Sequence, residues 1–340
     1  MSTIKEIAKL AGVSPTTVAN VLHGNTGKVS PATHKKVQAI LKKENYAPNM
    51  GAIILAHSNS RIIGIIMFMK PQRDDETVLE DPFSSAILGA MEQEIHKNGY
   101  FVMLHTTCDE NEVLRLSKAW KLDGLILVWA PDTICRIISG SIDTPLVYID
   151  CYFTDTEHVY HNIGLQDRRG GYEVTRYLLA MGHTDIMFLA NNPLFSGGDP
   201  ARFGGCQDAF QEQGLNLSLN SYMALPRARR DREVLYKRLG SADSPYTALV
   251  FSADYFAAEA VSFLQECSID VPGQISVTGF DDNILSRLVR PRLTTVHQDP
   301  GEKGRLAISM LMKLIRNEPV GETNVLLPIH LEIRDSVRRL

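Results

Sequence analysis

Polar side chains follow several apolar runs of this 340-residue sequence. Asp150 ends the run PLVYID, Asp254 and Tyr255 come after ALVFS, Asp281 follows ISVTGF, and Gln298 follows LTTVH. Ligands of open parallel sheets bind beyond the carboxyl ends of the strands, where such carboxylates and amides offer hydrogen bonds. We therefore expect these residues to line a cleft that binds a small molecule.

A second group of polar side chains lies near the N-terminus. Val18, Val21 and Leu22 have the spacing of one apolar helix face. The opposite face then presents small hydrogen-bonding groups, which are Thr16, Thr17, Asn20 and His23. Groups of this kind on an exposed helix read base edges in the major groove of DNA.

The elements that hold this polar face have a helix-turn-helix pattern. Thr3 and Glu6 have capping-box spacing at the start of a first helix, whose apolar face is Ile4, Ile7, Ala8 and Ala11. Gly12 permits the positive φ of a tight turn. Ser14 and Pro15 suit the N-cap and first position of the second helix. A generic helical hairpin is the alternative interpretation.

The charge of the first 60 residues favours a nucleic-acid partner. Ser30 precedes a third helix, expected over residues 31–45, whose outer face carries several lysines. Residues 1–60 contain seven lysines, no arginine and two glutamates, a net charge of +5, whereas the whole chain carries −4. A basic head on an acidic body indicates a polyanion bound by the head.

From residue 61 onward, apolar strands alternate with amphipathic helices. The expected strands are 61–69, 100–105, 124–129, 145–150, 185–190, 248–252, 274–280 and 325–329. The expected helices are 84–98, 111–121, 168–181, 200–213, 230–239, 255–267 and 301–316. This alternation predicts an α/β fold with parallel sheets, and the number of strands predicts two lobes.

Composition narrows the class of protein. No apolar run reaches the ~18 residues of a membrane span, and the N-terminus MSTIKEI has no signal-peptide core. The five cysteines are scattered, as in reduced cytoplasmic proteins. We expect a cytoplasmic protein with no cofactor and no metal site.

Several segments, in their order and spacing, resemble the lactose/galactose repressor family of bacterial transcription regulators. They are TIKEIAKLAGVSPTTVANVL, NYAPN, DRRGGYEVTRYLLAMGH, ARFGGCQDAF, VPGQISVTGFDDN and LTTVHQ. The resemblance implies a DNA-binding head at 1–49, a hinge helix and linker at 50–60, and a periplasmic-binding-protein-like core at 61–340. It places the N-lobe at about 61–161 and 291–323, and the C-lobe at about 162–290 and 324–340. It also implies a homodimer that binds double-stranded operator DNA, with an affinity set by a small effector, such as a sugar or sugar derivative.

Within the head, the resemblance places Pro15, Thr16 and Asn20 where the recognition helix reads bases. Relatives often have Arg or Ser in place of Asn20; Asn pairs with adenine, whereas Arg favours guanine. Ala52 and Leu55 match hinge positions that enter the minor groove, with Leu55 as a wedge between bases; a core leucine is the alternative. The expected DNA-contacting residues are Thr3, Ser14, Pro15, Thr16, Thr17, Asn20, His23, Asn25, Ala52 and Leu55.

Within the core, the expected effector-binding residues are Phe83, Asp150, Arg202, Asp254, Tyr255, Asp281 and Gln298. Asp254 and Tyr255 stand where the family usually has Asn and Asp. A guanidinium and carboxylates bind vicinal hydroxyls, and an aromatic ring covers apolar C–H groups, so a polyhydroxylated ligand is expected. As alternatives, an Asp after a strand can cap a helix, and Arg202 can pair with a neighbouring acid.

Two further functions stay open. The first is an enzyme of carbohydrate metabolism with a regulatory DNA-binding head, although no GxxxxGK[ST], GxGxxG, GxSxG or HExxH motif supports it. The second is a periplasmic-type binding module, which the basic head disfavours. The segment 330–340 lacks apolar heptads, so we expect dimers without a C-terminal coiled coil.

Overall fold

The structure, a computed structural model, describes residues 3–22, 26–46, 60–69, 78–153, 158–190 and 197–340. The chain divides into two compact units, Met1–Ser60 and Arg61–Leu340. The expected hinge at 50–60 lies outside the described residues except for Ser60.

Among its described residues, the first unit has the three helices that the sequence predicts. They are α1 (Ile4–Ala11), α2 (Pro15–Leu22) and α3 (Pro31–Lys43), with a 3-10 turn at Thr26–Lys28. The capping box of α1 is confirmed, because Thr3 Oγ1 accepts the Glu6 N–H at 3.3 Å and Glu6 Oε2 accepts the Thr3 N–H at 2.7 Å. Gly12 turns the chain with φ 65°. Ser14 Oγ accepts the Thr17 N–H at 3.1 Å.

The core of this unit is small and apolar. Its buried side chains are Ile7, Ala8, Ala11, Val18, Val21 and Val37. All six come from the faces that helical spacing predicts, so the polar face of α2 is turned outward. The third helix ends at Lys43, two residues before the expected end.

The described residues of the second unit form two six-stranded sheets. The first sheet has the order β11-β5-β4-β3-β1-β2 and the second β12-β10-β9-β8-β6-β7. The strands of the first are β1 (Ile62–Phe68), β2 (Phe101–Thr107), β3 (Gly124–Val128), β4 (Leu146–Ile149), β5 (Asn162–Leu165) and β11 (Asn324–Leu327). Those of the second are β6 (Ile186–Ala190), β7 (Tyr222–Ala224), β8 (Ala248–Phe251), β9 (Ser276–Asp281), β10 (Thr294–His297) and β12 (His330–Glu332). Among the described pairs, only β10 and β12 run antiparallel.

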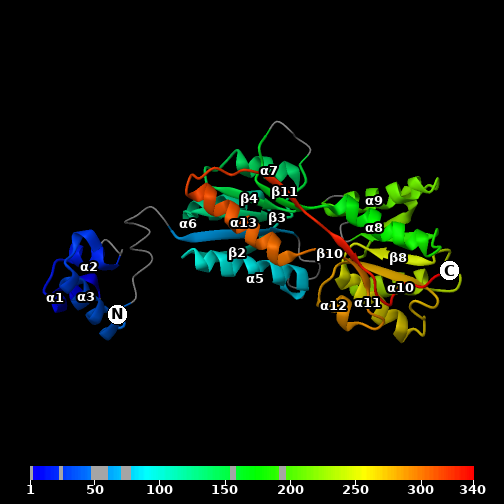
Figure 1. The fold of residues 1–340 in the computed structure, drawn as a ribbon, viewed down its shortest axis with the longest axis horizontal. Coiled ribbons are helices and arrows are strands. Elements are labelled where there is room, and N and C mark those ends of the chain that lie inside the picture. Colours follow the sequence, from blue (N-terminus) through cyan, green and yellow to red (C-terminus); the bar gives the residue numbers. More distant parts are fainter. Residues whose placement is uncertain (1–2, 23–25, 47–59, 70–77, 154–157, 191–196) are drawn as a thin grey trace. The chain divides into compact units, whose positions relative to one another are not determined.

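Helices cover both faces of each sheet (Figure 1). On the first sheet, α5 (Pro82–Lys97) and α13 (Pro300–Ile315) lie side by side on one face, and α6 (Glu110–Trp120) and α7 (Asp132–Ser139) cover the other. On the second sheet, α8 (Asp167–Ala180) and α9 (Gly198–Glu212) pack opposite α10 (Arg229–Leu239) and α11 (Asp254–Glu266). Strands buried on both faces explain the continuous apolar runs of the sequence. A short helix, α12 (Ile284–Leu288), follows β9.

The chain passes between the two sheets three times, which moves the expected lobe boundaries. Strands β5 and β11 pair in the first sheet, although the sequence suggested the C-lobe for both. Strand β10 pairs with β9 in the second sheet, although residues 291–323 were expected in the N-lobe. The boundaries 161/162, 290/291 and 323/324 are therefore wrong by a few residues each. Sheet membership depends on long-range pairing, which local spacing does not report.

Helices α8 and α9 cross at glycines, and this crossing positions the site. A Cβ on Gly171 would lie 1.8 Å from the Arg202 carbonyl oxygen, and one on Gly205 would lie 1.8 Å from the Arg168 carbonyl oxygen. Only glycine permits backbones to approach this closely. The crossing brings the start of α8 beside the first turns of α9.

Candidate functional sites

Two strand-end carboxylates from different lobes are joined by a chain of hydrogen bonds. Asp150 follows β4 of the first sheet, and Asp281 ends β9 of the second. Lys303 Nζ donates to Asp150 Oδ1 at 2.7 Å and Oδ2 at 2.8 Å, and to Gln298 Oε1 at 3.0 Å. Gln298 Nε2 then donates to Asp281 Oδ1 at 2.6 Å. The sequence placed Asp150 and Asp281 in opposite lobes, and sheet membership confirms this.

A second polar group surrounds Arg202. Its Nε donates to Asp167 Oδ1 at 2.8 Å, and its guanidinium carbon lies 3.6 Å from the centre of the Phe280 ring. Its Nη1 also donates to the Ser252 carbonyl oxygen. Tyr152, which follows the first-lobe strand β4, donates its hydroxyl to the same Asp167. The ion pair suggested as an alternative for Arg202 is therefore present, and Asp167 receives donors from both lobes.

Burial and charge shift the ionisation of these groups. Burial raises the pKa of Asp281 to about 7, although Arg202 counteracts this, and the nearby Asp81 raises the pKa further. Burial also raises the pKa of Asp150, against the opposing effect of Lys303. For Arg202, burial lowers the pKa, but Asp167 and other acids outweigh it and raise the pKa overall. Carboxylates thus outnumber cations around this cluster.

Two of the expected effector-binding residues lie differently from the rest. The side chain of Asp254 is fully buried; its Oδ1 accepts the Thr295 hydroxyl at 2.6 Å and its Oδ2 accepts the Asn283 N–H at 2.9 Å. This carboxylate therefore holds the segment after β9 against β10 and has no surface for a ligand. Tyr255 is partly exposed and packs edge-to-face on Phe256, with ring centres 5.2 Å apart.

Phe83 is close to the first chain of hydrogen bonds. It lies at the start of α5, is 6% exposed, and its ring centre is 5.3 Å from Lys303 Nζ. The structure thus brings Phe83, Asp150, Asp281 and Gln298 together through Lys303, with Arg202 near Asp281. A described hollow of the first lobe, lined by residues such as Arg136, Tyr148 and His158, contains none of them.

The sequence analysis missed three members of this cluster: Tyr152, Asp167 and Lys303. A signal for Lys303 existed, because Lys303, Ala307 and Leu311 are spaced four residues apart and share the buried face of α13. A lysine on an apolar face needs an acid partner. For Tyr152, the sequence offers no comparable signal.

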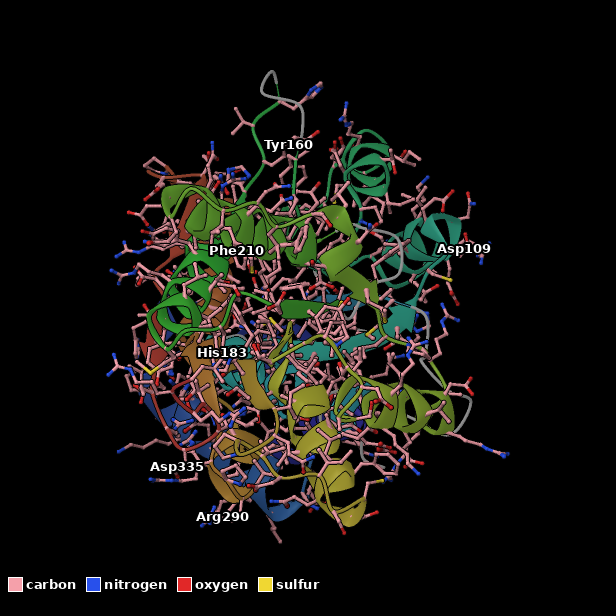
Figure 2. All side chains as sticks on the ribbon, turned by 90° about the vertical axis from the view of Figure 1, so that its right-hand side faces the viewer. Asp109, Tyr160, His183, Phe210, Arg290 and Asp335 are labelled. Carbon is pink, nitrogen blue, oxygen red and sulfur yellow. The ribbon has the colours of Figure 1, made fainter. Side chains whose placement is uncertain are left out.

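His183 is a buried polar residue whose hydrogen bonds go to other parts of the second lobe. It lies within the second lobe (Figure 2) and is fully buried. Its Nδ1 lies 2.9 Å from Thr247 Oγ1 and its Nε2 3.0 Å from the Arg338 carbonyl oxygen. Burial lowers its pKa, which favours the neutral ring. These contacts fix the segment at Arg338 against the second sheet.

On the head, the exposed face of α2 carries several of the expected base-reading residues. Pro15 and Thr16 are exposed, and Thr17 and Asn20 are half-buried. Thr3 and Ser14 are exposed too, but their hydroxyls cap helices. Four lysines of α3 are exposed as well: Lys35, Lys36, Lys42 and Lys43. The remaining predicted contacts, His23, Asn25, Ala52 and Leu55, lie outside the described residues.

Family models match both parts of the chain. The model described as bacterial regulatory proteins, lacI family, matches residues 3–49, and the periplasmic binding protein-like domain matches residues 175–337. No described helix is long and apolar enough to cross a membrane.

Proteins of known role align with nearly the whole chain. The HTH-type transcriptional regulator GalR of Escherichia coli (strain K12) is 31% identical over 337 residues, covering 96% of this chain and 94% of GalR. The HTH-type transcriptional repressor PurR of Histophilus somni (strain 2336) is 30% identical over 351 residues, covering 100% of both chains. The lac repressor dimer, solved with operator and the anti-inducer ONPF, has a TM-score of 0.84 at 24% identity, with 99% of each chain covered.

Proposed function

This chain belongs to the lacI family of bacterial regulatory proteins, and from this premise we propose that it is a cytoplasmic transcriptional repressor. It binds double-stranded operator DNA through the head, and a small effector held between the two lobes sets its operator affinity. The observation that carries this proposal is the pairing of an exposed polar helix, α2, on a basic head with a buried charged cluster that spans two lobes. It acts by binding alone, which the regulator role of its relatives supports.

DNA recognition is proposed to use the outward side chains of α2 for bases and the lysines of α3 for phosphates. Titration with operator and random DNA at several salt concentrations tests this. We expect log K to fall by roughly 0.9 for each phosphate neutralised. Asn20→Ala should cost about 1–3 kcal/mol on the best site and relax base preference.

A matched variant separates the two contributions. Lys42→Ala should weaken binding to all DNA sequences about equally and lower the salt dependence by about one phosphate. If Asn20→Ala behaved like Lys42→Ala, with uniform weakening and unchanged base preference, the base-reading role of Asn20 would be refuted.

The effector is proposed to be a polyhydroxylated ligand without negative charge. Among the residues that the structure describes, the acids around the cluster outnumber the cations: they are Asp81, Asp150, Asp167, Asp199 and Asp281, against Arg202 and Lys303. Such a site repels anions, whereas hydroxyl groups donate to carboxylates. Thermal-shift measurements with matched sugars and sugar phosphates, and with purines, followed by operator binding, test this because a ligand of the native state raises the melting temperature. A sugar phosphate that bound more tightly than its parent sugar would contradict the charge argument.

The working unit is proposed to be a homodimer on a near-palindromic operator, because two-fold protein symmetry requires a two-fold site. The segment after β11 belongs to the second lobe, since His330–Glu332 forms strand β12 of the second sheet. Light scattering on the complex with operator DNA tests this, and a monomer on the DNA would refute it.

A further inference from the structure

Lys303 is an unusual group to find on the inner face of α13. Its side chain is 1% exposed, and its ammonium group makes three hydrogen bonds, two to Asp150 and one to Gln298. An ammonium group has three N–H donors, so its hydrogen-bonding capacity is filled. The Phe83 ring lies 5.3 Å from the same nitrogen.

The contacts of Lys303 cross from one lobe to the other. Lys303 and Asp150 belong to elements of the first lobe, α13 and the end of β4. Gln298 directly follows β10 of the second sheet, and both ends of its amide are used: Oε1 accepts from Lys303, and Nε2 donates to Asp281. The continuous chain Asp150–Lys303–Gln298–Asp281, named here the lobe link, therefore connects the two sheets.

A second buried cation provides a comparison. Arg232 is also 1% exposed and binds Glu259 at 2.7 and 2.8 Å, but both residues lie in one lobe, on α10 and α11. That pair stabilises the packing of two neighbouring helices. The lobe link instead engages donors and acceptors of both lobes, and a ligand that joined Asp150 to Asp281 would compete for the same atoms.

We propose that Lys303, acting through Gln298, holds the two lobes together without effector and is a positioning residue for the effector response. This inference rests on the proposed function, because it concerns regulation at the same site. An effector then binds by replacing bonds of the lobe link, so its affinity reflects the difference between its own contacts and those it displaces.

Hydrogen exchange of the full-length protein tests the link without any ligand or DNA. The variant Lys303→Met changes the first lobe, and the reporters are second-lobe amides, those of Asn283 and Leu285 beyond Asp281. Losing one hydrogen bond between the lobes should make these amides exchange roughly fivefold faster. In a Gln298→Leu background, Lys303→Met should add no further change at these amides, because the link is already broken.

The matched control is Arg232→Met, which removes an equally buried cation. It should accelerate exchange in α10 and α11, within the second lobe, and leave the first-lobe amides of Ser84 and Asp150 as in the wild type. If Lys303→Met altered exchange only within the first lobe, Lys303 would have a purely local structural role, and the proposal would be overturned.

If Lys303→Met does not fold, a measurement from the other lobe still tests the lobe link. Gln298→Leu removes no charge, and its reporters are the first-lobe amides of Ser84 and Asp150. Faster exchange there supports the link, and unchanged exchange refutes it. Operator binding of the wild type is a separate result: a protein that binds no DNA refutes the proposed function, while the exchange data still decide the link.

Discussion

Two ion pairs between helices α8 and α9 allow the effect of burial to be measured within one interface. Arg202 donates from Nε to Asp167 at 2.8 Å, and the two side chains are 14% and 1% exposed. Arg168, the next residue after Asp167, donates to Asp208 at 2.6 and 2.7 Å, but these side chains are 64% and 37% exposed. Both pairs join an arginine to an aspartate across the same two helices, but they differ in burial, and Arg202 also contacts the Phe280 ring and the Ser252 carbonyl oxygen.

We predict very different costs for removing the arginine of each pair. In Arg202→Met, Asp167 keeps the Tyr152 hydroxyl but loses its buried cation, and breaking a buried pair in this way costs about 3–5 kcal/mol. In Arg168→Met, the exposed pair should contribute less than about 1 kcal/mol. At about 2–4 °C for each kcal/mol, the melting temperature should fall by roughly 6–20 °C in Arg202→Met.

Thermal unfolding followed by circular dichroism measures both variants under the same conditions. The double variant Arg202→Met/Asp167→Leu should recover much of the loss, since it leaves no unpaired buried charge. Equal losses in Arg202→Met and Arg168→Met, or no recovery in the double variant, would refute the view that desolvation makes the difference.

Four other substitutions test separate parts of the structure. Gly171→Ala places a methyl group against backbone at the α8–α9 crossing, so urea denaturation should show a free energy of unfolding lower by about 3 kcal/mol. Gly89→Ala is the control: a Cβ there would meet nothing within 4 Å, so the free energy of unfolding should rise by up to about 1 kcal/mol. The pKa of Asp281 is raised to about 7, so between about pH 4 and pH 7 the folded protein binds more protons at this residue than the unfolded protein does. The free energy of unfolding of the wild type should therefore fall as the pH rises from about 4 to about 7. Urea denaturation across this pH range should show a smaller fall in Asp281→Asn. Thr3→Ala removes the cap of α1 and should lower head stability by about 1 kcal/mol, seen as faster hydrogen exchange in α1.

The head was predictable because local rules determine it. Helical spacing identified the buried faces of α1 and α2, and the capping box at Thr3 and Glu6 marked the start of α1. In the core, long apolar runs identified β1, β3 and β6 for the same reason: strands buried on both faces leave little ambiguity in the sequence.

The features that sequence reasoning missed depend on distant residues. Strand β5, Asn162–Leu165, has only four residues, among them Asn162 and Gly164, and it is a strand because β4 and β11 flank it. Asp254 has the local signature of a strand-end ligand group, but Thr295 and the Asn283 amide occupy its carboxylate. Lys303 has its role only because α13 delivers it to Asp150, 153 residues away in sequence.

Because the chain crosses from one sheet to the other three times among its described strands, the order of synthesis limits when each lobe can fold. The first sheet requires β11, which reaches β5 from 162 residues away and is tied to it by the Asn162–Asn324 hydrogen bond at 3.0 Å. The second sheet requires β12, six residues farther along. Neither lobe can therefore be completed on the ribosome until residues 324–332 have been synthesised. Nascent chains that stop before β11 leave the edges of β5 and β10 open, and such edges pair with other chains. Both lobes thus become complete at nearly the same point of synthesis, when β11 and β12 emerge.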